Sequence, residues 1–129
     1  MIARPFEETD YQTVKQWWIG HGFPEFGVPS YELLPDDGLI IDDVCVAWVY
    51  LSSNAPMCRL GWPLGNPETS GRTVYKGLKQ VILQLHEFAR SKGCPLMEAT
   101  FSHEGLCKLM GSLDFQTGDT DLTGFIKGL

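Results

Sequence analysis

Several features that would mark a membrane, metal or nucleotide protein are missing from this sequence. The longest apolar run, Val44 to Leu51, is far shorter than the roughly 20 residues that span a bilayer. The opening MIARPFEETD has no apolar segment of a secretion signal, so we expect no signal peptide. No cysteine pair has the spacing of a zinc or redox motif, and no two histidines stand at ligand spacing, so we expect no metal site. Gly-x-Ser-x-Gly, Walker and Gly-x-Gly-x-x-Gly motifs are absent, which leaves hydrolase and nucleotide-binding functions without support.

Positive charge is also scarce, and its distribution is uneven. Ten Lys and Arg against 16 Asp and Glu give a net charge of −6 and a pI near 4.9, which makes nucleic-acid binding an unfavoured function. Residues 1–57 carry two basic and nine acidic residues, whereas residues 58–108 carry seven basic and four acidic ones. The basic middle can hold a small anionic ligand or can simply be solvated helix surface. The acidic first part, with Glu25, Glu32, Asp36 and Asp37, suits a cationic amine by long-range steering, although solvated loop charge is the commoner explanation.

A chain of 129 residues with 43% hydrophobic and 20% charged residues predicts one folded domain, residues 1–129, with its own core. The cysteines are expected to be buried free thiols in a reducing compartment, which favours a cytoplasmic location. The alternation and turn signals predict strands at 1–6, 39–41, 44–51, 57–64, 95–101 and 122–126. Gly61 and Pro63 predict a bulge or an edge in the strand 57–64.

Three helices are predicted between these strands. The first begins at Thr9, which forms a capping box with Gln12, carries Tyr11, Val14 and Trp18 on one face, and ends at Gly20-His21-Gly22. Trp17 lies off that face and is a candidate for a pocket or an interface. A long helix over 72–91 has one apolar stripe, made by Val74, Leu78, Val81, Ile82, Leu85, Phe88 and Ala89. Ser102 is expected to cap a short third helix, and the segment 23–38 is predicted to be a functional loop with one helical turn at 30–33.

The element order predicts a mixed α/β sheet with a right-handed parallel crossover across the long helix. This order resembles the GNAT acyl-CoA N-acyltransferase superfamily over essentially the whole chain. The resemblance lies in Ile2 to Phe6 with Thr9 to Tyr11, in Leu60 to Leu64 with Asn66-Pro67, in the long helix ending Phe88 to Gly93, and in Leu106 to Phe115. Trp17 to Gly22 and Leu34 to Gly38 are similar to segments of small phage-encoded members. The resemblance implies a central, mostly antiparallel sheet with helices on both faces.

The resemblance also implies acetyl-CoA or another acyl-CoA as the cofactor, bound in two places. The thioester would lie along the bulged strand, where Trp62 or Leu64 offers a backbone N–H, because Pro63 has none. The family's phosphate loop reads Gln/Arg-x-x-Gly-x-Gly/Ala, and the matching stretch here is Arg72 to Gly77. Arg72 and Gly77 fit that pattern, whereas Tyr75 stands where the first glycine belongs. The implied cofactor-binding residues are therefore Trp62, Leu64, Gly71, Arg72, Thr73, Val74, Tyr75, Lys76 and Gly77.

The proton-transfer residues of the family are harder to locate here. Met110 occupies the position of the tyrosine that protonates the leaving thiolate in many members, and Asp114 replaces the usual glycine. The fourth strand carries no glutamate base. His21, near the expected acceptor site, and His103, after the last strand of the crossover, are the remaining catalytic candidates. Helix capping is the structural alternative for both histidines.

Two functions follow from these observations. The first is an N-acyltransferase in which an amine, on a small molecule or a protein, attacks the thioester directly. The alternative is a catalytically degenerate phage protein that keeps the fold as a binding or structural module, in the host cytoplasm or on a virion. Either could act with a second copy of itself or with a phage protein as partner. An open groove between the strands at Gly61 and Pro95 would support the enzyme. A groove filled by Trp62, Tyr75 or Met110 would support the scaffold.

Overall fold

The computed structural model describes residues 1–101, 103–125 and 127–128. In chain order its elements are β1 (Ala3–Pro5), η1 (Glu8–Asp10), α1 (Tyr11–Gly20), η2 (Glu25–Gly27), η3 (Tyr31–Leu33), β2 (Asp37–Ile41), β3 (Cys45–Leu51), β4 (Met57–Gly65), α2 (Gly71–Ser91), β5 (Leu96–Glu98) and α3 (Glu104–Ser112). The three η elements are single 3-10 turns. The strands form one sheet in the order β1-β2-β3-β4-β5.

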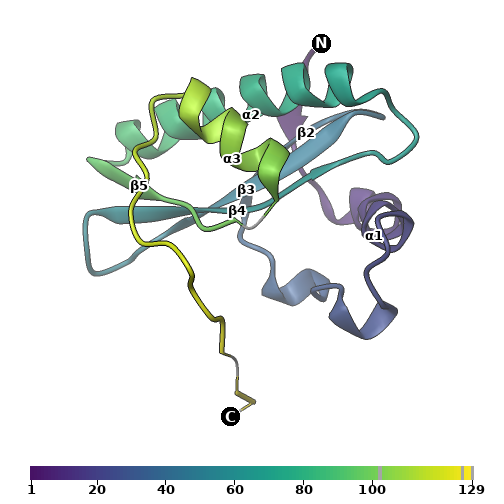
Figure 1. The fold of residues 1–129 in the computed structure, drawn as a ribbon, viewed down its shortest axis with the longest axis horizontal. Helices are drawn as coiled ribbons and strands as arrows, with labels where there is room; N and C mark the ends of the chain where they lie inside the picture. The colour runs from purple at the N-terminus through teal and green to yellow at the C-terminus, as the bar shows by residue number, and fades with distance from the viewer. Residues whose placement is uncertain (102, 126, 129) are drawn as a thin grey trace.

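The sheet is antiparallel from β1 to β4, and β5 then pairs parallel to β4. Helix α2 connects β4 to β5, which confirms the predicted parallel crossover. Figure 1 shows α2 and α3 over one face of the sheet, with α1 and the segment that follows it on the other face. The predicted mixed fold with helices on both faces is therefore confirmed.

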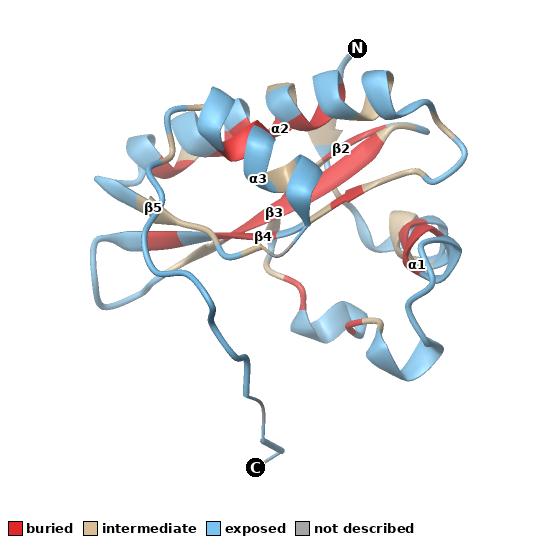
Figure 2. Ribbon diagram, in the orientation of Figure 1, coloured by how far each residue is buried: buried red, intermediate tan, exposed pale blue. Residues whose placement is uncertain are grey.

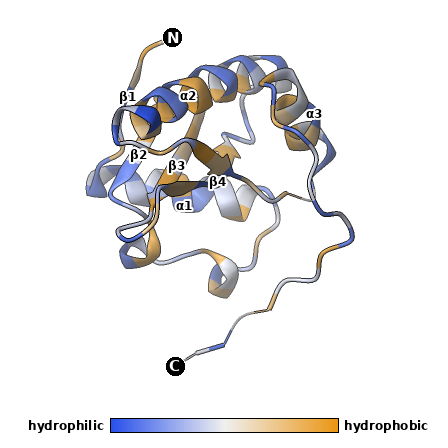
Figure 3. Ribbon diagram, turned by 90° about the vertical axis from the view of Figure 1, so that its left-hand side faces the viewer, coloured by the Kyte–Doolittle hydropathy of each residue, from blue (hydrophilic) through white to orange (hydrophobic). Residues whose placement is uncertain are grey.

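Strand β3 lies at the centre of the sheet and is buried along most of its length (Figure 2). Its side chains enter the two cores alternately. Cys45, Ala47 and Val49 pack toward α2, whereas Val46 and Trp48 pack toward α1. The continuous apolar run at 44–51 reflects this two-sided burial. The stripe predicted on α2 is confirmed, since the buried residues of α2 are Gly77, Leu78, Val81, Ile82, Leu85 and Ala89, and the apolar side of α2 faces the strands (Figure 3).

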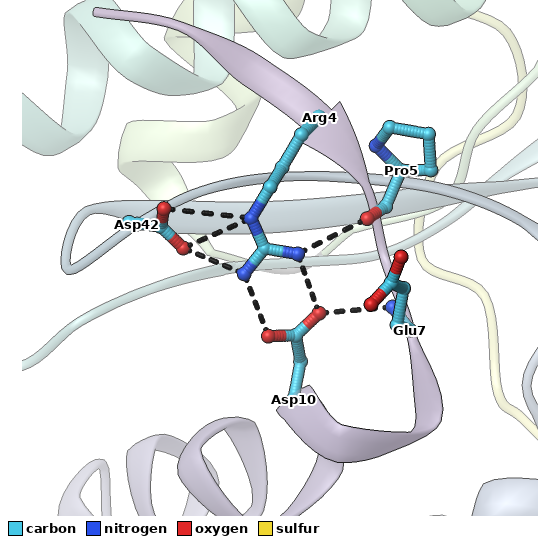
Figure 4. Close-up of polar contacts among 5 residues, drawn as sticks. All are labelled: Arg4, Pro5, Glu7, Asp10 and Asp42. Carbon is cyan, nitrogen blue, oxygen red and sulfur yellow. Dashed lines mark hydrogen bonds and ion pairs between the residues drawn. The ribbon is translucent and has the colours of Figure 1, made fainter.

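The N-terminus is held by an ion-pair network that the sequence analysis missed. Arg4 on β1 donates from Nη2 to Asp10 Oδ1 and to Asp42 Oδ1, at 2.7 Å each (Figure 4). Asp10 also accepts the backbone N–H of Glu7 at 2.9 Å. The predicted capping box of Thr9 and Gln12 is therefore wrong, because Asp10, fixed by Arg4, closes the turn before α1. The hydrogen bond from Arg4 lowers the pKa of the Asp10 carboxyl below its usual range.

Four further expectations need correction or fall outside the described residues. Trp17 is buried in the α1-side core rather than lining a pocket or an interface. No strand forms over residues 122–125, where Leu122 and Phe125 are exposed, and Ile126 lies outside the described residues. The predicted strand 95–101 is reduced to β5. The predicted cap Ser102 lies outside the described residues, and α3 begins after His103.

Candidate active site

The most irregular part of the sheet is a bulge in β4. Val46 pairs with Leu64 and Trp48 pairs with Gly61, so two steps along β3 are matched by three steps along β4. Trp62 lies in the bulge, between the paired residues Gly61 and Leu64. Its backbone φ is 53°, a left-handed value that is uncommon for a residue with a large side chain. The bulge predicted from Gly61 and Pro63 is confirmed. Neither Trp62 nor Pro63 has a partner in the register with β3, so the regular ladder is interrupted at the bulge.

Strands β4 and β5 part just before this bulge. Their parallel pairing ends at Arg59 and Glu98. Beyond it lies a cavity of about 390 Å³, lined by Tyr50, Arg59, Leu60, Gly61, Trp62, Thr100 and Phe101. Its volume lies within the range of about 300–1,000 Å³ that is usual for small-molecule sites. The opening lies beside Gly61, as the sequence analysis expected of an enzyme, but on the second strand it is lined by Thr100 and Phe101 rather than by Pro95, and Trp62 forms one of its walls.

Tyr50 and Trp62 form the polar centre of this cavity. The indole Nε1–H of Trp62 donates to the Tyr50 hydroxyl oxygen at 2.6 Å. The Tyr50 hydroxyl in turn donates to the carbonyl of Leu33 at 3.3 Å, which ties the cavity to the segment after α1. The Tyr50 ring lies over Gly61, where an added Cβ would come within 2.5 Å of Tyr50 Cε2. Gly61 is therefore required for the close approach of this ring to β4.

An ion pair borders the same cavity. Arg59 donates to Glu98 Oε1 from Nη2 at 2.8 Å and from Nε at 3.1 Å. The hydroxyl of Thr100 donates to the same oxygen at 3.5 Å. The sequence analysis found no glutamate base on β4, and the carboxylate of Glu98 on the neighbouring strand is bound by the arginine of β4.

The start of α2 carries the residues expected to hold the cofactor phosphates. Ser70 caps the helix by accepting the N–H of Thr73 at 3.3 Å, and Gly71, Arg72 and Lys76 are exposed. A helix N-terminus with free N–H groups and nearby cations attracts anions. The other members of the expected set have packing contacts. Val74 lies against Gly65, Tyr75 donates to Ser112 Oγ at 3.2 Å, and Gly77 is buried against Val44 and Cys45.

The two candidate histidines lie apart from each other and outside the lining of the cavity. His21 ends α1, and its Nε2–H donates to the carbonyl of Gly65 at 2.7 Å. Gly65 is four residues from Gly61, which is about 13 Å along an extended strand. His103 accepts the N–H of Leu106 on Nδ1 at 3.3 Å and so caps α3. Leu64, a predicted cofactor contact, is buried in the α1-side core next to the bulge.

No protein-family model matches this sequence, and no curated protein is a significant match to it. Solved structures do match it over nearly the whole chain. An acetyltransferase from Trypanosoma brucei has a TM-score of 0.66 at 16% identity, covering 97% of this chain and 99% of its own. The structure of AAC(6')-Iy in complex with the bisubstrate analogue CoA-S-monomethyl-acetylneamine has a TM-score of 0.61 at 20% identity, covering 99% and 97%. A transcriptional regulator from Bacillus halodurans has a TM-score of 0.71 at 13% identity, covering 97% and 99%.

This chain has the GNAT acetyltransferase fold. At these identities the likeness establishes the fold alone, and one of the matching proteins is described as a transcriptional regulator. These structures do not show the phage resemblance, so it stays a prediction. Function has to be argued from the cavity.

Within the GNAT fold, α3 explains two of the departures noted in the sequence. Met110 is buried in the α2-side core, so it is a packing residue at this position. Asp114 has a φ of 65°, and its N–H donates to Gly111 while that of Phe115 donates to Met110. A helix that ends in this way needs a residue with a left-handed backbone, and glycine adopts that conformation most easily. Asp114 adopts it here in place of the glycine expected from the resemblance.

Tyr50, like Arg59 and Thr100, is a polar cavity residue that the sequence analysis did not predict. Its side chain lies on the α1 face of β3, as does that of Trp48 two residues earlier. Because side chains two residues apart on a strand share a face, the sequence could have placed Tyr50 on the same side of the sheet as Trp48. A second hollow of about 140 Å³ lies between β1 and the segment after α1, lined by Phe6, Tyr31, Glu32, Leu34, Pro35 and Asp36. Over the described ranges, no helix is long and apolar enough to cross a membrane. No group of three or more potential metal ligands occurs in the same ranges.

Proposed function

We propose that this chain is an N-acyltransferase that takes its acyl group from acyl-CoA, with acetyl-CoA as the expected donor. The observation that carries the proposal is the cavity at the bulge of β4, where β4 and β5 part. The fold supports it, because acetyltransferases share this architecture and one of them was solved with a CoA bisubstrate analogue. The amine would attack the thioester directly, since a thioester is already activated toward nucleophiles.

The donor would lie along β4 with its thioester beside Gly61 to Leu64. The backbone N–H of Trp62, which lies at the bulge where the register with β3 shifts, would bind the carbonyl oxygen as negative charge develops on it. The pyrophosphate would lie at the start of α2, over Gly71 to Gly77, where Arg72 and Lys76 supply positive charge. The residues of this stretch that face inward, Val74 and Gly77, would contribute by fixing the helix against the sheet.

The acceptor amine would enter beside α1 and the segment 23–38. Acidic side chains on this segment, among them Glu32 and Asp36 at the smaller hollow, would attract a cationic amine. His21 and His103 are kept as candidates for the base that removes the proton of the amine. Because neither lines the cavity, each would act through water or on the amine as it enters.

Calorimetric titration with acetyl-CoA and with free CoA tests the proposal. We expect micromolar binding, weakened about 2–5-fold by Arg72→Ala, because an exposed charge contact contributes up to about 1 kcal/mol. Lys79→Ala removes the same charge from an exposed position further along α2 and should leave the affinity unchanged. Absence of heat and of any thermal shift at millimolar cofactor would contradict the enzyme. The alternative, a binding or structural module with an inactive site, would then be the function to test.

A further inference from the structure

An acyltransfer that releases a thiolate needs a proton for the sulfur, and the GNAT fold of this chain has Met110 where a tyrosine was expected. The proton must then come from another group at the cavity. Of its lining residues, Arg59 keeps its proton at any working pH and is bound by Glu98. The hydroxyl of Thr100 faces the same carboxylate. Among the lining residues that the structure describes, Tyr50 is the one whose proton can be donated and regained.

The hydrogen bonds of Tyr50 suit that task. Its oxygen receives the indole N–H of Trp62 in a short bond of 2.6 Å, and this bond stabilises the oxygen as negative charge appears on it. Its own proton makes a longer bond of 3.3 Å to the carbonyl of Leu33. That bond is long for an O–H donor and therefore weak. Breaking it costs little free energy when the hydroxyl turns to another acceptor. The ring is fixed over Gly61, which places the hydroxyl beside the bulge.

We infer that Tyr50 is the catalytic acid that protonates the leaving thiolate, an inference that rests on the proposed function. The amine nitrogen forms the bond to the acyl carbon, and the carbon–sulfur bond breaks with its electron pair on sulfur. The Tyr50 hydroxyl proton passes to that sulfur, which leaves as the thiol. The phenolate then regains a proton from the acylated nitrogen, which carries one proton too many after the attack. The indole of Trp62 is the positioning group, because it holds the phenol oxygen through its Nε1–H, whereas the carbonyl oxygen is assigned to the backbone N–H of the same residue.

The test uses acetyl-CoA with hydroxylamine, a small amine that needs no specific acceptor site, and measures the hydroxamate formed. Tyr50→Phe removes the oxygen and keeps the ring over Gly61. We expect kcat to fall by about 10²–10⁴-fold, the usual contribution of a positioned acid, with the Kd of acetyl-CoA unchanged within about twofold. The matched control is Tyr11→Phe, which also removes a hydroxyl bound to a backbone carbonyl, that of Pro29 at 2.8 Å. Tyr11 does not line the cavity, so its variant should keep the full kcat.

The pH profile separates an acid from a structural residue. An acid must be protonated to act, so the kcat of the wild type should fall at alkaline pH, and Tyr50→Phe should lack that alkaline limb. Trp62→Phe keeps the phenol but removes the N–H that stabilises its anion. We therefore expect its kcat to be reduced about 3–10-fold. A merely structural role for Tyr50 would leave the alkaline limb in place in Tyr50→Phe.

The possible outcomes separate this inference from the proposed function. If Tyr50→Phe keeps kcat within about twofold of the wild type, Tyr50 is not the acid, although the enzyme stands. The inference is also overturned if the variant weakens acetyl-CoA binding as much as it lowers kcat, or if the wild type binds acetyl-CoA without transferring it faster than buffer does. A wild type that does not bind acetyl-CoA at all contradicts the proposed function, and this is seen before any variant is made.

Discussion

Arg59 on β4 and Glu98 on β5 form an ion pair at the last rung of the parallel ladder, with Nη2 2.8 Å from Oε1. One residue after Glu98 the strand has ended, and Thr100 and Phe101 already line the cavity. The pair therefore marks the position at which β4 and β5 part. Both side chains are partly exposed to solvent, at 58% for Arg59 and 39% for Glu98.

Neutralising this ion pair should cost little stability. We expect a double-mutant cycle of Arg59→Gln and Glu98→Gln to give a coupling of about 0.2–1 kcal/mol in urea unfolding, because water and salt screen an exposed pair. The coupling should decrease as the salt concentration rises. A coupling well above this range, or one that salt leaves unchanged, would mean that the pair helps to hold the two strands together.

Acid should weaken the N-terminal network through Asp10. Because Arg4 lowers the pKa of this carboxyl in the folded state, the network stabilises the fold above the usual carboxyl pKa. That stabilisation is lost as the pH falls through the lowered pKa of the folded state. Asp10→Asn should cost about 1.5–3 kcal/mol near neutral pH in urea unfolding, the range for a hydrogen bond to a charged group.

The difference between wild type and Asp10→Asn should shrink toward zero as the pH is lowered below about 4. Asp42→Asn is the matched variant, since Asp42 binds the same guanidinium but its side chain is 68% exposed. It should cost less than about 1 kcal/mol. A difference for Asp10→Asn that stays constant down to the acid transition would show that the ionised carboxylate is not what stabilises the turn.

The acidic residues at the smaller hollow should act on the acceptor and leave the chemical step unchanged. We expect Glu32→Gln combined with Asp36→Asn to raise the KM of a polyamine such as spermidine about 2–5-fold at low salt, with kcat unchanged. Hydroxylamine, which is uncharged near neutral pH, should show no change. Glu87→Gln with Glu104→Gln, two carboxylates on α2 and α3, is the control for net charge. Equal effects from both pairs would contradict a local role for Glu32 and Asp36.

The parts of the fold that depend on local pattern could be predicted from the sequence. The stripe on α2 and the two-sided burial of β3 follow from periodicity, and Gly61 with Pro63 identified the bulge. The cap of α1 could not be read in the same way, because Asp10 owes its place to Arg4 on β1. The segment 122–126 has a strand-like pattern, but a strand forms only where a partner is available.

The site was less accessible to sequence reasoning for a related physical reason. Tyr50 meets Trp62 only because the bulge shifts the register between β3 and β4 by one residue, and a shift of this kind is a property of two strands at once. The ion pair of Glu98 with Arg59 likewise depends on the parallel pairing of two strands that are far apart in the sequence. His21 and His103 were predicted as catalytic candidates from their residue type alone. In the structure His21 donates to the backbone carbonyl of Gly65, and His103 caps α3.

Adding one methyl group at Gly61 should disturb the site more than its size suggests. An added Cβ would come within 2.5 Å of Tyr50 Cε2, so Gly61→Ala must displace the ring and break its bond with Trp62. We expect a loss of about 1–3 kcal/mol in urea unfolding, the cost of overpacking. With Tyr50→Ala the clash is removed, so the two substitutions together should cost less than their sum.

The control for this prediction is a second glycine, for which the opposite sign is expected. Gly111 lies inside α3, and a Cβ added there would meet nothing within 4 Å. Gly111→Ala should therefore stabilise the fold by about 0.5–1 kcal/mol, because alanine loses less backbone freedom on folding. Loss of stability in both variants would indicate a general intolerance of substitution. Loss at Gly61 alone, relieved by Tyr50→Ala, would show that the ring over β4 sets the cost, since the crowding exists only while Tyr50 lies there.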